Sequence, residues 1–145
     1  AEEKQPSRRQ YALLVGALHA LAHGTVDGPR SASLIMDSYL LRALSTAGLA
    51  PSLDRCASCG TEGVHAWFSP SAGGLMCDRC RPAGTPRVAP QTMSLLTSLL
   101  VGDWPATRRV ADGTRQEASE LVSAFAVWHT EHGLRTLAHV DRQPG

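Results

Sequence analysis

Apolar residues near the start of the chain recur at three- and four-residue steps, the spacing that places side chains on one face of a helix. Tyr11, Leu14 and Leu18 follow this spacing, and Gly24 marks its end. We therefore predict a helix over residues 7–23. Its apolar face is formed by Tyr11, Leu13, Leu14, Val15, Leu18 and Leu21.

A second segment, residues 33–47, is apolar on nearly every side. Its polar residues Ser38, Arg42 and Ser45 fall on one narrow side, and Gly48 follows its last turn. A helix that is apolar almost all round is buried. This segment is therefore expected to be the central helix of the protein.

Two further helices are expected in the second half of the chain. The third covers residues 90–101, and Pro90 suits its first turn, where a backbone donor is not needed. The fourth begins at a capping box formed by Thr114 and Glu117, whose side chains satisfy free N–H groups of the first turn. Gly133 is expected to end this helix.

Between the second and third helices the helical pattern stops. Residues 64–68 have the composition of a short strand, and residues 70–74 are rich in Pro and Gly and can reverse the chain. Residues 75–76 would return beside the first strand. This pattern predicts a small hairpin with almost no hydrophobic core of its own.

The four cysteines of the chain lie around this hairpin as two Cys-x-x-Cys pairs, Cys56 with Cys59 and Cys77 with Cys80. Two thiolates separated by two residues can face one ion from a tight turn, and Gly60 tolerates the backbone angles of such a turn. The second pair completes a tetrahedral shell. We predict one structural Zn²⁺ that fastens the hairpin, because four thiolates leave no open position for catalysis.

Other interpretations of the cysteines fit less well. A redox dithiol requires a single pair at a strand-to-helix turn of a βαβ unit, and no such pattern surrounds these pairs. Four unrelated buried cysteines would not be expected to share this spacing. His65, which lies between the pairs, could replace one cysteine as a ligand, although four thiolates already complete the shell.

Length, composition and net charge limit the classes of protein to which this chain can belong. A chain of 145 residues suits one domain with at most a small appendage, and 43% hydrophobic residues are enough for a core. The formal net charge of +1 is not the strongly basic balance typical of nucleic-acid binding. No apolar run approaches the roughly 18 residues of a membrane span, and the first residues lack the apolar segment of a signal peptide. A cytoplasmic protein without membrane contact is expected.

These patterns together predict a mainly α protein, a small helical bundle with an inserted four-cysteine zinc-ribbon-like hairpin. Residues 1–145 would form a single helical domain, with residues 53–83 as its zinc-binding insertion. The sequence contains no Ser/His/Asp arrangement, glycine-rich phosphate loop or HExxH signature. A protein without catalytic activity is therefore expected.

A longer pattern surrounds the cysteine pairs. It runs from Tyr39-x-Leu41 through Leu44 to Gly48-x-x-Pro51-x-Leu53-x-x-Cys56-x-x-Cys59-Gly60, and continues with Phe68 and Gly73-Gly74-x-x-Cys77-x-x-Cys80. Near the end of the chain it closes on Gly133-Leu134-Arg135-Thr136-Leu137. These motifs resemble the RecO family of bacterial recombination and repair proteins over nearly the whole chain.

The resemblance implies a protein that binds single- and double-stranded DNA and anneals complementary strands. RecO-like proteins act with RecR to load RecA onto DNA coated by single-strand-binding protein, in the cytoplasm at the nucleoid. In that family an N-terminal OB-fold precedes a helical C-terminal region, which carries a zinc site in many members. Because this sequence has no strands for a five-stranded barrel, the resemblance implies the C-terminal region alone.

Six arginines are candidates for contacts with DNA phosphates: Arg55, Arg79, Arg81 and Arg87 near the cysteines, and Arg108 and Arg109 before the fourth helix. The first four could instead offset the net charge of −2 on Zn²⁺ with four thiolates. The other two could belong to an ordinary solvated loop. Trp67 and Phe68 could stack on unpaired bases, or could cover the small core of the metal module.

A protein-interaction module is the second hypothesis. RecO-like C-terminal regions resemble docking platforms for the acidic, apolar tail of single-strand-binding protein, and RecR is a further partner. An apolar groove with an arginine at its edge would suit such a tail. Arg42, beside the apolar bulk of the second helix, is the candidate. A third hypothesis is an accessory zinc domain of a larger enzyme.

Overall fold

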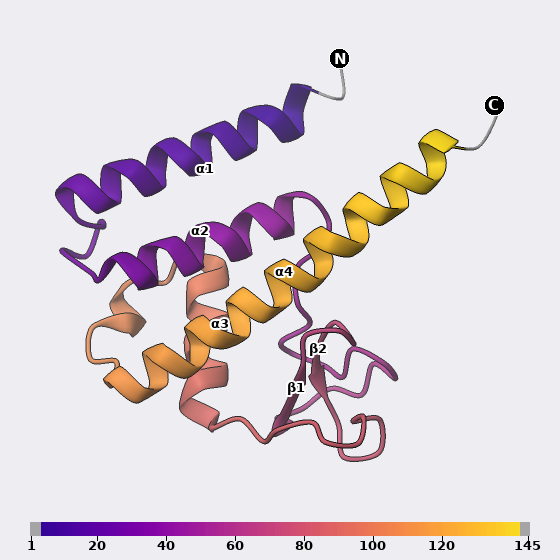
Figure 1. The fold of residues 1–145 in the computed structure, drawn as a ribbon. Coiled ribbons are helices and arrows are strands. Elements are labelled where there is room, and N and C mark those ends of the chain that lie inside the picture. Colours follow the sequence, from indigo (N-terminus) through magenta and orange to yellow (C-terminus); the bar gives the residue numbers. More distant parts are fainter. Residues whose placement is uncertain (1–3, 143–145) are drawn as a thin grey trace.

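The computed structural model describes the backbone of residues 4–142 and the side chains of residues 8–132. The described chain contains the helices α1 (Lys4–His23), α2 (Ala32–Thr46), α3 (Pro90–Val101) and α4 (Asp112–Arg142). Between α2 and α3 lie two antiparallel strands, β1 (Trp67–Ser69) and β2 (Gly74–Met76), and a short 3-10 helix, η1 (Pro105–Thr107), precedes α4. Figure 1 shows the helices gathered beside the hairpin. The mainly α fold with an inserted cysteine-bearing hairpin is confirmed.

Helix α2 is the central helix, as its sequence predicts. It packs against α1, α3 and α4, and its side chains Leu34, Ile35 and Leu41 are buried. Burial of an aliphatic side chain of this size stabilises the fold by about 1.5–3 kcal/mol. The side chain of Ser31 accepts a hydrogen bond from the N–H of Leu34 and caps the first turn of the helix.

The hydrophobic core is shared by the helices and the hairpin. Leu99 of α3 and Phe125 of α4 are buried in it, together with Phe68 of β1. The ring centroids of Phe68 and Phe125 are 6.4 Å apart in a tilted arrangement. Such aromatic pairs contribute about 0.5–1.5 kcal/mol beyond the burial of their area. Phe68 therefore anchors the hairpin to the helices, and it is a core residue rather than an exposed stacking platform.

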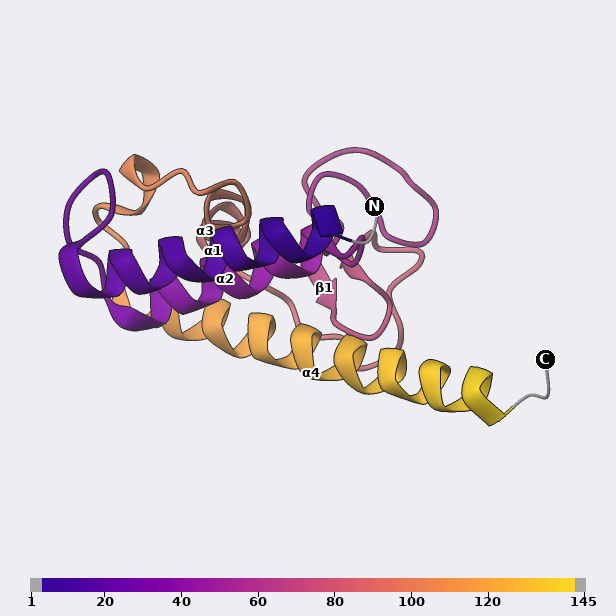
Figure 2. The same cartoon turned by 90° about the horizontal axis from the view of Figure 1, so that it is seen from above.

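The apolar face expected on α1 is present, but most of it is exposed. Tyr11 is 69% exposed and Leu18 is 57% exposed, whereas Ala17 is buried. Helix α1 packs against α2, and the small side chain of Ala17 allows the two backbones to approach closely. Figure 2 shows α1 and α2 lying along each other. The hydrophobic pattern alone does not reveal which part of an apolar face has a partner.

Two expectations for α4 were wrong. The helix begins at Asp112, two residues before Thr114, and it continues past Gly133 to Arg142. A glycine inside a helix costs only about 1 kcal/mol relative to alanine, so Gly133 does not have to end one. The carboxylate of Glu117 accepts a hydrogen bond from the N–H of Ala89, 3.3 Å away, and so joins α4 to the residue that precedes α3. No helix in the described residues is both long and apolar enough to cross a bilayer.

Candidate metal centre and arginine face

The two Cys-x-x-Cys pairs adopt the same local turn. The N–H of Gly60 donates to the carbonyl oxygen of Cys56 at 2.9 Å, and the N–H of Arg81 donates to that of Cys77 at 3.1 Å. Each bond spans four residues, so the two cysteines of a pair lie on one side of their turn. Gly60 has a φ of +77°, which residues other than glycine rarely adopt.

Backbone pairing holds the two turns next to each other. The N–H of Ser52 donates to the carbonyl oxygen of Gly73 at 2.9 Å, and the N–H of Leu75 donates to that of Ser52 at 2.8 Å. The N–H of Ala57, within the first Cys-x-x-Cys pair, donates to the carbonyl oxygen of Leu75 at 2.7 Å. On the other side of the hairpin, the N–H of Val88 donates to the Ala66 carbonyl oxygen at 2.8 Å. We refer to residues 52–88, joined by these bonds, as the cysteine lobe.

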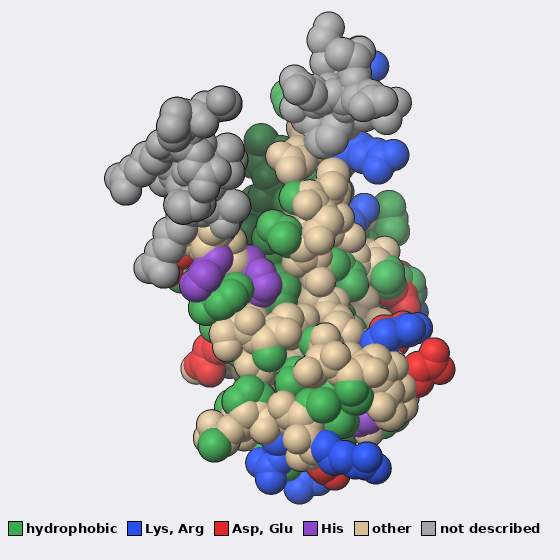
Figure 3. Space-filling view, turned by 90° about the vertical axis from the view of Figure 1, so that its right-hand side faces the viewer, with side chains coloured by type: hydrophobic (Ala, Val, Ile, Leu, Met, Phe, Trp, Pro, Cys, Tyr) green, Lys and Arg blue, Asp and Glu red, His purple; other side chains and the backbone are tan. Residues whose placement is uncertain are grey.

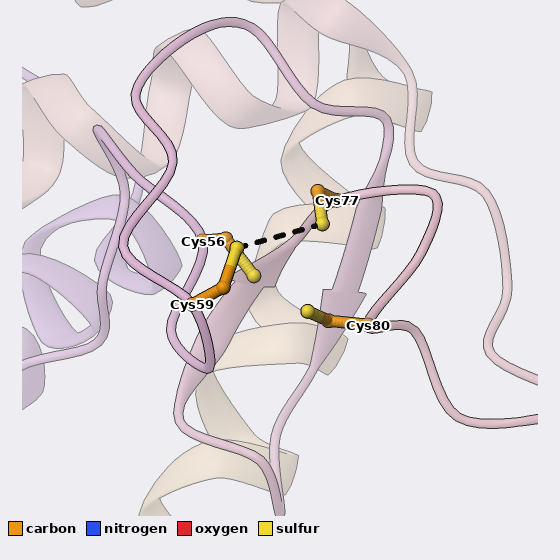
Figure 4. A group of neighbouring side chains, drawn as sticks. All are labelled: Cys56, Cys59, Cys77 and Cys80. Atoms are coloured by element: carbon orange, nitrogen blue, oxygen red, sulfur yellow. Dashed lines mark hydrogen bonds between the residues drawn. The ribbon is translucent and has the colours of Figure 1, made fainter.

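The four cysteine sulfurs converge on one point of the cysteine lobe (Figure 4). All four lie within 4.8 Å of one another, and the sulfurs of Cys59 and Cys77 are 3.8 Å apart. A tetrahedral Zn²⁺ with bonds of about 2.3 Å requires sulfur atoms about 3.8 Å apart. The four residues therefore fit a metal ion in both donor chemistry and spacing. His65 is outside this cluster, and its Nε2 lies 2.9 Å from the carbonyl oxygen of Thr61.

The cysteine thiols differ in their pKa. Burial opposes ionisation of Cys56, but hydrogen bonds from the backbone N–H groups of Cys59, Cys77 and Ser58 outweigh it and lower its pKa to about 6. The pKa of Cys80 is raised to about 12, chiefly by its hydrogen bonds with the side chains of Cys77 and Cys59. Four neighbouring thiolates repel one another, so a divalent cation is the natural partner for this cluster.

Three of the predicted DNA-contacting arginines gather beside the metal centre. The guanidinium carbon of Arg81 lies 3.8 Å from the centroid of the Trp67 ring, and that of Arg87 lies 5.7 Å from it. The indole N–H of Trp67 donates to Asp78 at 2.6 Å. Among the side chains described, no carboxylate pairs with Arg79, Arg81 or Arg87. We refer to these three exposed arginines as the arginine face. Figure 3 shows Lys and Arg side chains clustered at the lower end of the molecule.

The remaining predicted arginines do not join this face. Arg55 forms ion pairs with Asp54 and Glu62, each at 3.4 Å. Arg108 pairs with Asp27, and Arg109 is exposed in the segment between η1 and α4. This segment and the cysteine lobe lie at opposite ends of the molecule in both ribbon views (Figures 1 and 2). The six arginines therefore do not form one surface.

Two hollows have an arginine in their lining, which is the feature that the docking hypothesis predicts. Arg42 and Arg9 line one of about 450 Å³, with Leu13 and Leu100 among its other lining residues. A second hollow, of about 690 Å³, lies between the cysteine lobe and α3, with Arg87 in its wall. Its lining is mostly apolar and includes Leu53, Val64, Leu75, Val88, Pro90 and Met93. Sequence reasoning missed this second hollow, because its residues come from four separate segments that only the fold brings together.

Comparison with known proteins identifies the family. The family model described as "Recombination protein O C terminal" matches residues 1–138. The chain belongs to the RecO family. It is 51% identical over 140 residues to the DNA repair protein RecO of Cutibacterium acnes, covering 97% of this chain and 57% of the relative. The RecO protein of Nocardioides sp. is 48% identical over 145 residues, covering 98% of this chain and 58% of the relative. No solved structure matches.

Membership of the RecO family confirms the resemblance drawn from the cysteine and glycine motifs. The chain spans less than three fifths of the length of these RecO relatives. The match to a C-terminal family model agrees with the absence of barrel-forming strands from the described residues. In this RecO-family chain, the candidate site consists of the metal centre and the arginine face next to it.

Proposed function

We propose that this chain is a DNA-contacting region of a RecO-family repair protein, in which one structural Zn²⁺ bound by Cys56, Cys59, Cys77 and Cys80 orders the cysteine lobe. The observation that carries the proposal is the arginine face. Arg79, Arg81 and Arg87 have no carboxylate partners among the described side chains, so their charges are available to phosphates. Arg55 and Arg108, which form ion pairs, would contribute less, and Arg109 would contribute separately.

Strand annealing needs no bond-making chemistry. It requires positive side chains that screen the phosphate charges of two strands and hold them close together. The proposed role is therefore a non-enzymatic one, in which the protein binds single- and double-stranded DNA, anneals strands and acts with RecR to load RecA in the cytoplasm. In this proposal residues 1–145 are a single helical domain, and residues 53–83 are its zinc-binding insertion.

Fluorescence anisotropy with a labelled single strand, across a series of salt concentrations, tests the proposal. The zinc-loaded chain is compared with a variant that carries R79A, R81A and R87A. Each lost phosphate contact lowers the slope of log affinity against log salt by about 0.7 for single-stranded DNA, so the variant should lose about 2 from this slope. Arg8→Ala is the control, because Arg8 is an exposed arginine of α1 that lies outside the cysteine lobe and is not among the predicted DNA contacts.

The alternative role of these arginines, compensation of the negative zinc centre, gives a different result. In that case the triple variant binds zinc more weakly and releases it to a lower concentration of a competing chelator. With zinc in excess, it binds DNA as tightly as the original chain does. Folded, zinc-loaded protein that does not bind DNA, or a triple variant with an unchanged salt slope, would overturn the proposal.

A second candidate function is docking of the tail of single-strand-binding protein or of RecR. The observations that favour it are the two hollows with arginines in their walls, Arg42 in one and Arg87 in the other. An acidic, apolar peptide could place its side chains in such a hollow and its carboxylates on the guanidinium. Binding of a labelled tail peptide should weaken at least about fivefold in Arg42→Ala or in Arg87→Ala. It should depend on salt less steeply than DNA binding does, because apolar burial is not screened.

A further inference from the structure

The indole of Trp67 and the guanidinium of Arg81 form a stack at the surface of the cysteine lobe, with 3.8 Å between the guanidinium carbon and the ring centroid. Two contacts keep the indole in place. Its N–H donates to Asp78 at 2.6 Å, and the backbone of Trp67 pairs with Met76 of β2 on one side and with Arg87 on the other. The plane on which Arg81 rests is therefore fixed by the fold.

The contact with Trp67 restricts the Arg81 side chain to one orientation, in which its guanidinium can stack on a second planar group. A free arginine side chain loses substantial rotamer freedom when it binds, and the indole has already restricted that freedom here. Arg81 is exposed, and no carboxylate pairs with it among the described side chains. A planar group can thus stack on the guanidinium side that faces away from Trp67. Arg87, whose guanidinium carbon lies 5.7 Å from the same ring centroid, supplies a second positive charge beside the stack.

We propose that the stack of Trp67 and Arg81 binds an unpaired nucleobase, with the adjoining phosphate held by Arg87. A base in a duplex has neighbours on both faces, whereas an unpaired base can present one face to an arginine or an aromatic ring. The stack therefore selects single-stranded DNA, and the arginine face as a whole supplies affinity for any phosphate backbone. This inference rests on the proposed function and specifies how the same surface distinguishes single strands from duplexes.

The test separates base stacking from phosphate binding by means of three labelled probes: an oligothymidine, an abasic strand of the same length, and a duplex. The original chain is compared with Arg81→Lys, which keeps the positive charge but lacks the planar group. We expect the original chain to bind oligothymidine at least about fivefold more tightly than the abasic strand. In Arg81→Lys this preference should fall to near unity, while the salt slope with the abasic strand stays the same.

A second variant, Trp67→Leu, removes the plane beneath Arg81 and should lose the same preference. Its zinc content is measured first, so that loss of the lobe is not mistaken for loss of stacking. Equal affinity of the original chain for oligothymidine and the abasic strand would overturn the inference and leave the proposed function standing. A preference that survives in both variants would also overturn it. Failure to bind any of the three probes would overturn the proposed function, and the inference with it.

Discussion

The guanidinium of Arg108 donates to the carboxylate of Asp27 and joins residues that are 81 positions apart in the sequence. The same carboxylate accepts a hydrogen bond from Arg30 at 2.6 Å. Arg30 also donates to the hydroxyl of Thr107 and to the carbonyl oxygen of Trp104. The loop between α1 and α2 is thus fastened to the segment around η1. Arg108, which the sequence offers as a DNA contact, is engaged within the fold.

Replacement of Asp27 by Asn should lower the thermal stability of the protein at neutral pH. Hydrogen bonds from Arg108 and Arg30 hold the pKa of Asp27 well below its usual range. A lowered pKa stabilises the folded state above the ordinary carboxyl pKa of about 4, and this stabilisation is lost as the pH falls further. The difference in Tm between the original chain and Asp27→Asn should therefore be constant between pH 7 and 5 and shrink below pH 4.

Thermal unfolding followed by circular dichroism checks this dependence. Both proteins are studied with a chelator present, so that loss of metal in acid does not enter the comparison. Arg108→Ala should cost less than Asp27→Asn, because Arg30 keeps its partner. Equal Tm values for Asp27→Asn and the original chain at pH 7 would show that the ion pairs of Asp27 with Arg108 and Arg30 do not stabilise the fold.

The pKa of Asp37 is raised, whereas that of Asp27 is lowered. Asp37 is 4% exposed between α2 and α4, its Oδ1 lies 3.4 Å from the hydroxyl of Ser119, and its Oδ2 has no hydrogen-bond partner among the described residues. Burial raises the pKa of this carboxyl, against the effects of Ser119 and of the charge on Arg115. The charged form therefore destabilises the folded state increasingly as the pH rises through the raised pKa.

Replacement of Asp37 by Asn should accordingly raise the free energy of unfolding at pH 7 by about 1 kcal/mol. The gain should shrink on acidification, because the carboxyl of the original chain then becomes neutral as well. Urea denaturation at several pH values measures both effects. Glu120→Gln is the control, because Glu120 is exposed on α4 next to Ser119 and its replacement should change little. A loss of stability in Asp37→Asn at every pH would contradict the argument.

Removal of zinc should unfold the cysteine lobe and spare most of the helices. The strands β1 and β2 have three residues each, and two strands of that length are not stable alone. After treatment with a chelator, we expect the far-ultraviolet helical signal to remain largely intact, while limited proteolysis cuts within residues 52–88. Because Cys80 must lose its proton to bind the metal, zinc should bind at least about tenfold more tightly at pH 8 than at pH 6. A chelated lobe that stays resistant to protease would show that its backbone pairing and its packing against the helices hold it without the metal.

The parts of this protein that could be predicted from its sequence are those determined by local spacing. The apolar character of nearly every side of residues 33–47 predicts α2 as a buried helix, and Pro90 marks the first turn of α3. The spacing of the cysteines predicts their convergence, because each pair lies within one turn. The ion pair of Arg108 with Asp27 and the exposure of Tyr11 depend on which segments meet in space. The stack of Arg81 on Trp67 also depends on the fold, because the hairpin brings together two residues that are 14 positions apart in the sequence. No local pattern distinguishes a paired arginine from a free one.

Replacement of Gly74 should damage the metal centre although Gly74 is not a ligand. Its φ is +130°, and a Cβ at this position would lie 2.5 Å from the carbonyl oxygen of Ser52. That carbonyl accepts the hydrogen bond from Leu75 that holds the first cysteine turn beside the second. Gly74→Ala would therefore both strain the backbone and separate the two pairs of ligands.

We expect Gly74→Ala to destabilise the zinc-loaded protein by about 3 kcal/mol or more and to weaken zinc binding. Gly84→Ala is a matched control in the same lobe, since Gly84 has a φ of +82° but no atom within 4 Å of an added Cβ. Its cost should be limited to the strain of that backbone angle, about 1–2 kcal/mol, with zinc affinity retained. Zinc competition with a chromophoric chelator compares the two variants. If both lose zinc equally, backbone strain explains the effect, and the close approach of Ser52 to Gly74 does not control the geometry of the metal centre.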